Sequence, residues 1–162
     1  MIEIHPTARI SPLADIEDSV RGTKIVIGAY SVIDSFCKIK PAGGSGDVII
    51  GENVVVNSGC VIYSGNGVEI MSDAAIAANC VFAPVNHQYK NASMPIREQG
   101  FAPSKGGILI EQDVWIGAGC VFLDGAIVRR GCVIGAMSLV NKDTQSLGVY
   151  AGNPAIMTGL RE

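Results

Sequence analysis

The amino-acid sequence predicts an all-β fold, a parallel solenoid of about six triangular coils. Three observations predict it: a large apolar residue recurs every six positions, a small residue usually follows it four places later, and extra residues fall only at the end of a coil. An ordinary β-sandwich of short strands does not impose one six-residue phase on so much of a chain, so the solenoid is the better interpretation. The recurring large residues form six groups of three: Ile4, Ile10 and Ile16; Ile27, Ile33 and Ile39; Ile50, Val56 and Ile62; Ile70, Ile76 and Phe82; Ile110, Ile116 and Phe122; and Val128, Ile134 and Val140.

Each six-residue unit is interpreted as a short strand followed by a corner. Strand side chains alternate, so the small residue two places before the large one faces inward with it. Glycine and asparagine often lie near the corners, as at Gly59 and Gly131, where they suit sharp turns. Three such sides close one coil, and the coils stack along the chain.

The chain leaves this repeat only after the third side of a coil. Extra residues fall at 22–26, 45–49, 68–69 and 88–109. Only the last segment is long enough to build a structure of its own. We therefore expect one long excursion loop at about residues 88–109, a short C-terminal tail after the sixth coil, and a single domain over residues 1–162.

The five cysteines all occupy the small inward position of the repeat, where cysteine acts as a compact apolar residue. Their number is odd and no two have the CxxC spacing, so neither a disulfide framework nor a zinc site is expected. They are Cys37, Cys60, Cys80, Cys120 and Cys132.

Composition excludes several classes of protein. Apolar residues make up 48% of the chain and charged residues 17%, so the chain is not disordered. No apolar run approaches the roughly 18 residues of a membrane span, and no secretory signal is recognisable, so we expect a cytoplasmic protein without membrane insertion. The net charge is −3, with no basic cluster beyond Arg129 and Arg130, so no nucleic-acid partner is expected.

The position just before each large inward residue faces outward, yet it is often apolar. So much outward apolar surface indicates burial against another chain. A closed, symmetric homo-oligomer satisfies this, and a three-sided prism favours a homotrimer. His87 has the same outward phase at the start of the long loop. The outward apolar residues are Val32, Val55, Val61, Val81, Trp115, Val121, Ile127, Val133 and Leu139.

The repeat and three longer stretches together resemble a known family. The stretches are IAANCVFAPVNH, VWIGAGCVFLDGAIVRRGCVIGAMSLVNKD and VYAGNPA, and the repeat fits the pattern [LIV]-[GAED]-x-x-[STAV]-x. The chain resembles the hexapeptide-repeat acyltransferases, and within them the sugar and xenobiotic O-acetyltransferases related to galactoside and maltose acetyltransferases. The resemblance covers nearly the whole chain. It implies a left-handed parallel β-helix that uses acetyl-CoA as acyl donor and needs no metal.

The resemblance also implies roles for individual residues in a site between subunits. The family's catalytic histidine falls at His87, which removes the proton of an acceptor hydroxyl while that oxygen attacks the thioester. An imidazole with a pKa near 6.5 suits this role, because it is a free base at neutral pH. The acceptor is expected to meet Asn57, Asn86, Trp115 and Tyr89.

Acetyl-CoA is expected to lie along a second set of positions that the resemblance assigns to the donor. A backbone N–H near Gly117 and Ala118 is expected to stabilise the oxyanion, and Lys142 to meet a phosphate. The full donor set is Gly117, Ala118, Ala136, Asn141 and Lys142.

Some positions depart from the family. After GNPA the family usually carries a basic residue for the phosphates of CoA, whereas this chain has Ile156, with Arg161 nearby. Galactoside acetyltransferases place an acidic residue on the sugar where this chain has Gly65 beside Asn66, so a galactoside acceptor is not expected.

The preferred acceptor is a sugar hydroxyl in surface-polysaccharide or lipopolysaccharide biosynthesis, because MPIREQGF resembles the loops of such acetyltransferases. An antibiotic acetyltransferase and an aminosugar N-acetyltransferase stay open as alternatives. A catalytically inactive scaffold is a more remote one, since a scaffold has little use for His87 and the long loop. A γ-type carbonic anhydrase is excluded, because it needs three histidines and this chain has two.

Overall fold

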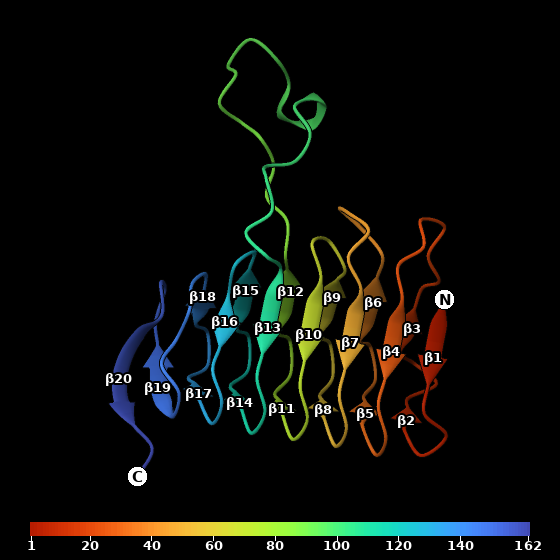
Figure 1. Cartoon of the computed structure of the whole chain (residues 1–162), viewed down its shortest axis with the longest axis vertical. Helices are drawn as coiled ribbons and strands as arrows, with labels where there is room; N and C mark the ends of the chain where they lie inside the picture. The colour runs from red at the N-terminus through yellow and green to blue at the C-terminus, as the bar shows by residue number, and fades with distance from the viewer.

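The structure is a computed structural model that describes residues 1–162. Three sheets run along the whole chain and form the three faces of a prism (Figure 1). Each strand pairs in parallel with the equivalent strand of the next coil, as in the register of Ile4 with Ile27 and of Phe82 with Phe122. The predicted solenoid of six coils is confirmed. No helix of the structure has the length and apolar character needed to cross a membrane.

The strands of each sheet follow one another from coil to coil. Sheet A contains β1 (Ile2–Ile4), β4 (Ile25–Ile27), β7 (Val48–Ile50), β10 (Val68–Ile70), β13 (Ile108–Ile110) and β16 (Ile127–Val128). Sheet B contains β2 (Arg9–Ile10), β5 (Val32–Ile33), β8 (Val55–Val56), β11 (Ala75–Ile76), β14 (Trp115–Ile116), β17 (Val133–Ile134), β19 (Gly148–Ala151) and β20 (Ile156–Leu160). Sheet C contains β3 (Asp15–Ile16), β6 (Lys38–Lys40), β9 (Val61–Tyr63), β12 (Val81–Ala83), β15 (Val121–Leu123) and β18 (Leu139–Val140).

The core is a stack of inward side chains, as the repeat predicts. Ile50, Ile76, Ile116 and their equivalents in the second to sixth coils are almost fully buried, whereas Ile4 of the first coil, at the end of the prism, is 43% exposed. Phe82 and Phe122 stack near the middle, with ring centroids 4.8 Å apart and ring planes 10° apart. All five cysteines are buried and free, as expected from their phase.

Two edges of the prism matter for the site. Edge BC is where each coil passes from sheet B to sheet C, at residues 34–37, 57–60, 77–80, 117–120 and 135–138. Edge CA is where each coil passes from sheet C to sheet A. The long loop leaves the prism at edge CA, between β12 and β13 (Figure 1).

The loop boundaries differ from the expected 88–109. The segment between strands runs from residue 84 to residue 107, because Ile108 and Leu109 already belong to β13. Ile108 and Ile110 are both buried, so the first side of a coil is a three-residue strand with two inward side chains. The same holds for β4, β7 and β10, which take up part of the extra residues expected at 22–26, 45–49 and 68–69.

The expected short C-terminal tail is present, and it forms strands. After β18 the chain forms β19, which pairs with β17, and then β20, which returns antiparallel to β19. Tyr150 of β19 is largely buried, and its hydroxyl accepts a hydrogen bond from the backbone N–H of Gln145. The tail is therefore a hairpin that extends sheet B.

Candidate active site

His87 lies at the root of the long loop, where two short antiparallel segments form a stalk. The backbone N–H of Gln88 donates to the carbonyl of Gly100 at 3.0 Å, and that of Ala102 donates to the carbonyl of Asn86 at 2.7 Å. His87 and Phe101 form the pair between these two bonds. Their ring centroids are 4.8 Å apart. The imidazole is exposed and makes no hydrogen bond with another group of the chain.

A small apolar hollow of about 180 Å³ lies at the same edge, beside the root of the loop. Tyr63, Pro84 and Val85 line it, together with Ala42, Gly43 and Ala83. Val85, one of the residues that line this hollow, is two residues before His87 in the sequence. Tyr89, further along the loop, has a side chain that is 69% exposed.

Asn57 lies at edge BC, directly after β8. Its side-chain N–H donates to the carbonyl of Ile76 at 2.8 Å, while its side-chain oxygen has no partner within the chain. Gly117, Ala118 and Ala136 lie on the same edge, on later coils. The structure therefore places one predicted acceptor residue and three predicted donor residues along the same edge.

Buried thiols face the inner side of this edge. Cys37 Sγ donates to the carbonyl of Asn57 at 3.1 Å, and Cys80 Sγ donates to the carbonyl of Gly117 at 3.3 Å. Cys120 Sγ and Ser138 Oγ both donate to the carbonyl of Gly135, at 3.1 and 2.6 Å. The carbonyls of these corner peptides thus point into the prism.

In a trans peptide the N–H points away from the C=O. The N–H groups of Ala118 and Ala136 therefore point outward, and they donate to no group of the chain. Both alanine residues are exposed, so their small side chains leave these donors accessible. Edge BC carries a row of unpaired N–H groups that suits an extended ligand with carbonyl oxygens.

Trp115 lies on the outer face of sheet B, between Ala75 and Val133 of the adjacent coils. Its side chain is 57% exposed. The other outward apolar residues predicted from the sequence are partly exposed. In a single chain this surface has no cover.

Asn141 and Lys142 lie at edge CA, after β18, and both are exposed. Lys142 forms no ion pair in the chain. Arg161, by contrast, donates to Asp113 Oδ2 at 3.0 Å and to the carbonyl of Gly131 at 3.0 Å. Of these two basic residues, only Lys142 has a positively charged group that is not paired with a carboxylate of the chain.

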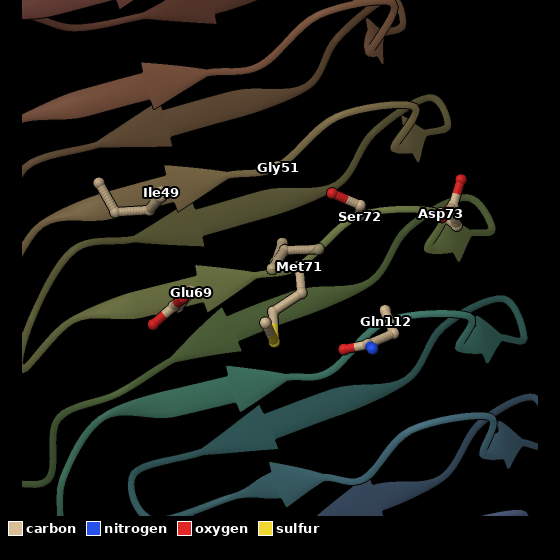
Figure 2. A pocket seen from close by; sticks show the side chains of 8 residues that line it. Ile49, Gly51, Glu69, Met71, Ser72, Asp73 and Gln112 are labelled. Atoms are coloured by element: carbon tan, nitrogen blue, oxygen red, sulfur yellow. The ribbon is translucent and has the colours of Figure 1, made fainter.

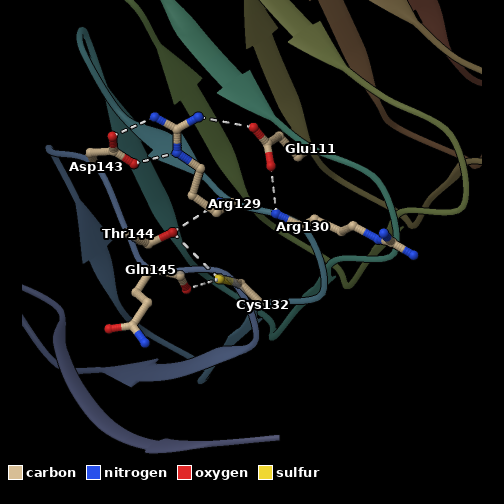
Figure 3. Close-up of polar contacts among 7 residues, drawn as sticks. All are labelled: Glu111, Arg129, Arg130, Cys132, Asp143, Thr144 and Gln145. Carbon is tan, nitrogen blue, oxygen red and sulfur yellow. Dashed lines mark hydrogen bonds and ion pairs between the residues drawn. The ribbon is translucent and has the colours of Figure 1, made fainter.

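An ion network next to Lys142 was not found by sequence reasoning. Arg129 binds Asp143 through two hydrogen bonds of 2.8 and 2.6 Å, and it binds Glu111 at 3.0 Å (Figure 3). The hydrogen bonds from Arg129 hold the pKa of Asp143 below its ordinary value. The backbone N–H of Arg129 also donates to Thr144 Oγ1 at 2.9 Å. The network ties the chain after Lys142 to sheet A. The sequence shows the charged residues but not that they pair with one another.

One hollow on the outer face of sheet A is unrelated to these residues. An open hollow of about 450 Å³ lies there, lined by Ile49, Glu69, Met71 and Gln112 among others (Figure 2). None of the predicted site residues contributes to it. No cluster of three or more histidine, cysteine or acidic side chains is placed to hold a metal ion.

The predicted site residues thus divide between two edges. His87, Asn86, Asn141 and Lys142 lie at edge CA, and Tyr89 lies in the loop that leaves it. The rest lie at edge BC or on sheet B. Sheet C separates the two edges within one chain.

Comparison with known proteins identifies relatives of the chain. Residues 107–142 match the family described as bacterial transferase hexapeptide (six repeats). A chloramphenicol acetyltransferase of Agrobacterium fabrum is 26% identical over 150 residues, which cover 86% of this chain and 69% of the relative. A putative lipopolysaccharide biosynthesis O-acetyl transferase, WbbJ of Escherichia coli, is 32% identical over 119 residues, which cover 70% of this chain and 61% of the relative.

A solved structure shows the same fold. A variant of AntD, an N-acyltransferase from Bacillus cereus in complex with dTDP and coenzyme A, superposes with a TM-score of 0.83 at 22% identity. The superposition covers 99% of this chain and 84% of AntD. These findings confirm the resemblance to the hexapeptide-repeat transferases, and the fold is the left-handed parallel β-helix that the resemblance implies.

Proposed function

We propose that the protein is an acetyltransferase that moves the acetyl group of acetyl-CoA to a hydroxyl of a sugar-type acceptor. The observation that carries the proposal is an exposed imidazole at the root of the only long interruption of the prism. The imidazole of His87 makes no hydrogen bond within the chain, so its ring nitrogens are available to an acceptor hydroxyl. The acetyltransferase names of the relatives support the reaction class.

The reaction is a direct transfer with His87 as general base. One ring nitrogen takes the proton of the acceptor hydroxyl while the oxygen attacks the thioester carbonyl carbon. The C–S bond breaks, and the imidazolium returns the proton to the departing thiolate. The products are the acetyl ester and CoA.

Edge BC supplies the binding surface for the donor in this proposal. The outward N–H groups of Ala118 and Ala136 meet the carbonyl oxygens of the extended thioester arm, and one of them stabilises the oxyanion. Gly117 leaves no room for a side chain, because an added Cβ would lie 2.5 Å from the backbone nitrogen of Ala136. Asn141 and Lys142, at edge CA, meet the nucleotide end of CoA.

A complete site requires two chains, because one chain separates its two edges by sheet C. A homotrimer around a threefold axis parallel to the prism brings edge CA of one chain to edge BC of its neighbour. The outward apolar positions and Trp115 supply surface for such contacts. The site between subunits then combines His87 of one chain with Asn57 and the N–H row of the next.

The acceptor class is the finer part of the proposal. The name of WbbJ supports a hydroxyl acceptor in lipopolysaccharide biosynthesis. The chloramphenicol acetyltransferase supports an antibiotic acceptor, and AntD supports transfer to an amine. Release of free CoA thiol, measured with nucleotide sugars, aminosugars, oligosaccharides and antibiotics, separates the three classes.

We predict that His87→Ala lowers the rate of acetyl transfer by about 10²-fold or more, because a general base contributes on this scale. The matched control is His5→Ala, since His5 is the only other histidine and its ring is bonded to Thr7 in a local turn. The control is expected to keep full activity, and both variants to keep the mass of the wild-type oligomer in light scattering. Undiminished activity of His87→Ala contradicts the proposal.

A further inference from the structure

A buried carboxylate of the prism, directly after β15, binds the end of the long loop, outside the site described above. Asp124 is only 2% exposed. Its Oδ2 accepts the backbone N–H of Lys105 at 2.8 Å, and its Oδ1 accepts the backbone N–H of Gly107 at 2.9 Å. A buried carboxylate is tolerated only where hydrogen bonds compensate its lost hydration. Both of these bonds come from the last residues of the loop, so Asp124 fixes the point at which the loop rejoins the prism.

Between its two ends, which the N–H groups of Asn66 and Gly125 also bind, the loop is held by its own groups. Gln99 organises its outer part: its side-chain oxygen accepts the N–H of Asn91, and its side-chain nitrogen donates to the carbonyls of Asn91 and Met94. The two stalk bonds of residues 86–88 with residues 100–102 close the inner part. Asp124 is thus a buried anchor between a self-contained loop and the rigid prism.

Phe101 is the group of the stalk that touches His87. In an antiparallel ribbon, two directly opposite residues that do not hydrogen-bond to each other have their side chains on the same face and closer together than a hydrogen-bonded pair. His87 and Phe101 form such a pair, and their ring planes are inclined by 51°. No polar group of the chain holds the imidazole, so this aromatic contact is what restricts its rotation.

We propose that Phe101 and Asp124 are positioning residues for His87. Phe101 fixes the direction of the imidazole, and Asp124 fixes the strand that carries Phe101, four residues before Lys105. The inference rests on the proposed role of His87 as general base. The ordering of the imidazole by Phe101 and Asp124 can be measured without the reaction.

The first test uses NMR and does not need an acceptor. The chain has two histidines, so His87→Ala assigns both sets of imidazole signals. In the wild-type protein, we expect the ring-current field of Phe101 to shift the His87 signals. Phe101→Ala should move them toward free-imidazole positions, Phe101→Tyr should retain the shift, and the His5 signals should stay in place. Unchanged His87 signals in Phe101→Ala overturn the proposal.

The same measurement applies to Asp124. Asp124→Ala leaves two buried N–H groups without an acceptor and risks misfolding. Asp124→Asn keeps one acceptor oxygen and is the working variant. We expect it to broaden or duplicate the His87 signals while circular dichroism and the His5 signals stay unchanged. A single, sharp and unmoved set of His87 signals overturns the role of Asp124.

Kinetics provide the second test. We expect Phe101→Ala and Asp124→Asn to lower kcat about tenfold, with KM for acetyl-CoA nearly unchanged and with recovery in Phe101→Tyr. Tyr30→Ala, which removes another exposed aromatic ring on the second coil, serves as control and should have no effect.

If His87→Ala is fully active, the proposed function fails, while the NMR result still decides whether Phe101 and Asp124 position the imidazole. If His87→Ala is inactive but Phe101→Ala and Asp124→Asn are not impaired, the positioning proposal fails alone.

Discussion

The cysteines show how far single residues are predictable from this sequence. Their phase predicts that they face inward, and all five are buried and free. Their hydrogen bonds are not visible in the sequence, because the acceptor carbonyl belongs to another coil, 37 residues away in the case of Cys80 and Gly117. A thiol that looks like filler in the repeat therefore also orients a corner peptide of the proposed donor surface.

We predict that Cys80→Val and Cys80→Ser differ in their effect on donor binding. Valine fills the volume but cannot donate to the Gly117 carbonyl, so the peptide that presents the Ala118 N–H loses an inner bond. We expect Cys80→Val to raise KM for acetyl-CoA several-fold, and Cys80→Ser to stay close to the wild type, as Ser138 already donates from the same position two coils later.

The control for this prediction is Cys37→Val. Cys37 makes the equivalent bond to the Asn57 carbonyl, away from Ala118 and Ala136. The Cys37→Val substitution should leave KM for acetyl-CoA unchanged. Equal effects of all three substitutions in titrations followed by initial rates would show that the thiols only fill space.

At the level of elements, the sequence predicts the period but not where each strand begins or ends. The period marks one large residue per side, and it does not reveal that the first side of a coil has a second inward residue, such as Ile25 or Ile108. The C-terminal hairpin was missed because every residue of β20 is exposed and the strand carries no repeat. It is held by pairing with the adjacent strand β19 and by the bond of Arg161 to Asp113, which lies 48 residues away in the sequence.

The Arg129 network fixes the element that follows Lys142 and is expected to make stability depend on pH. Arg129 lowers the pKa of Asp143, so the folded protein gains stability from this pair while the carboxylate is ionised. The gain is present above the ordinary carboxyl pKa of about 3.9 and is lost as the pH falls through the lowered value.

We therefore predict that Arg129→Met lowers Tm by no more than a few degrees near pH 7, because the pair is exposed and screened by solvent. The difference from the wild type should shrink as the pH falls below about 4. Differential scanning calorimetry at several pH values checks this. A Tm difference that is constant with pH would show that Arg129 stabilises through packing of its stem rather than through charge.

For the whole molecule, the proposed site is divided between two edges, and this division explains why the sequence can suggest its residues but not their geometry. The phase of the repeat assigns a residue to the inside or the outside of the prism. The two edges differ only in the strand that precedes them, which belongs to sheet B at edge BC and to sheet C at edge CA. His87 and Ala118 are both outward, yet sheet C lies between their edges. In the proposed function an assembly of chains brings them together, and no pattern within one chain records the neighbour.

Complementation between two inactive variants tests this assembly. Ala118→Pro removes the outward N–H with little expected change of fold, because Gly119 has a φ of +71° and the corner therefore has the form of a type II turn, which favours proline at its second position. His87→Ala removes the base from the other edge. We expect each variant alone to have at most about 1% of the wild-type rate.

After the two variants are unfolded and refolded together in equal amounts, most trimers contain both kinds of chain. Each mixed trimer then has one site with an intact His87 and an intact edge BC. Activity should then recover to about a quarter of the wild-type rate, as random assembly into symmetric trimers requires. If each site were built within one chain, every chain in the mixture would still lack one of the two groups and no activity would return. Thiol release of the refolded mixture, compared with each variant refolded alone and with the mass from light scattering, distinguishes the two arrangements.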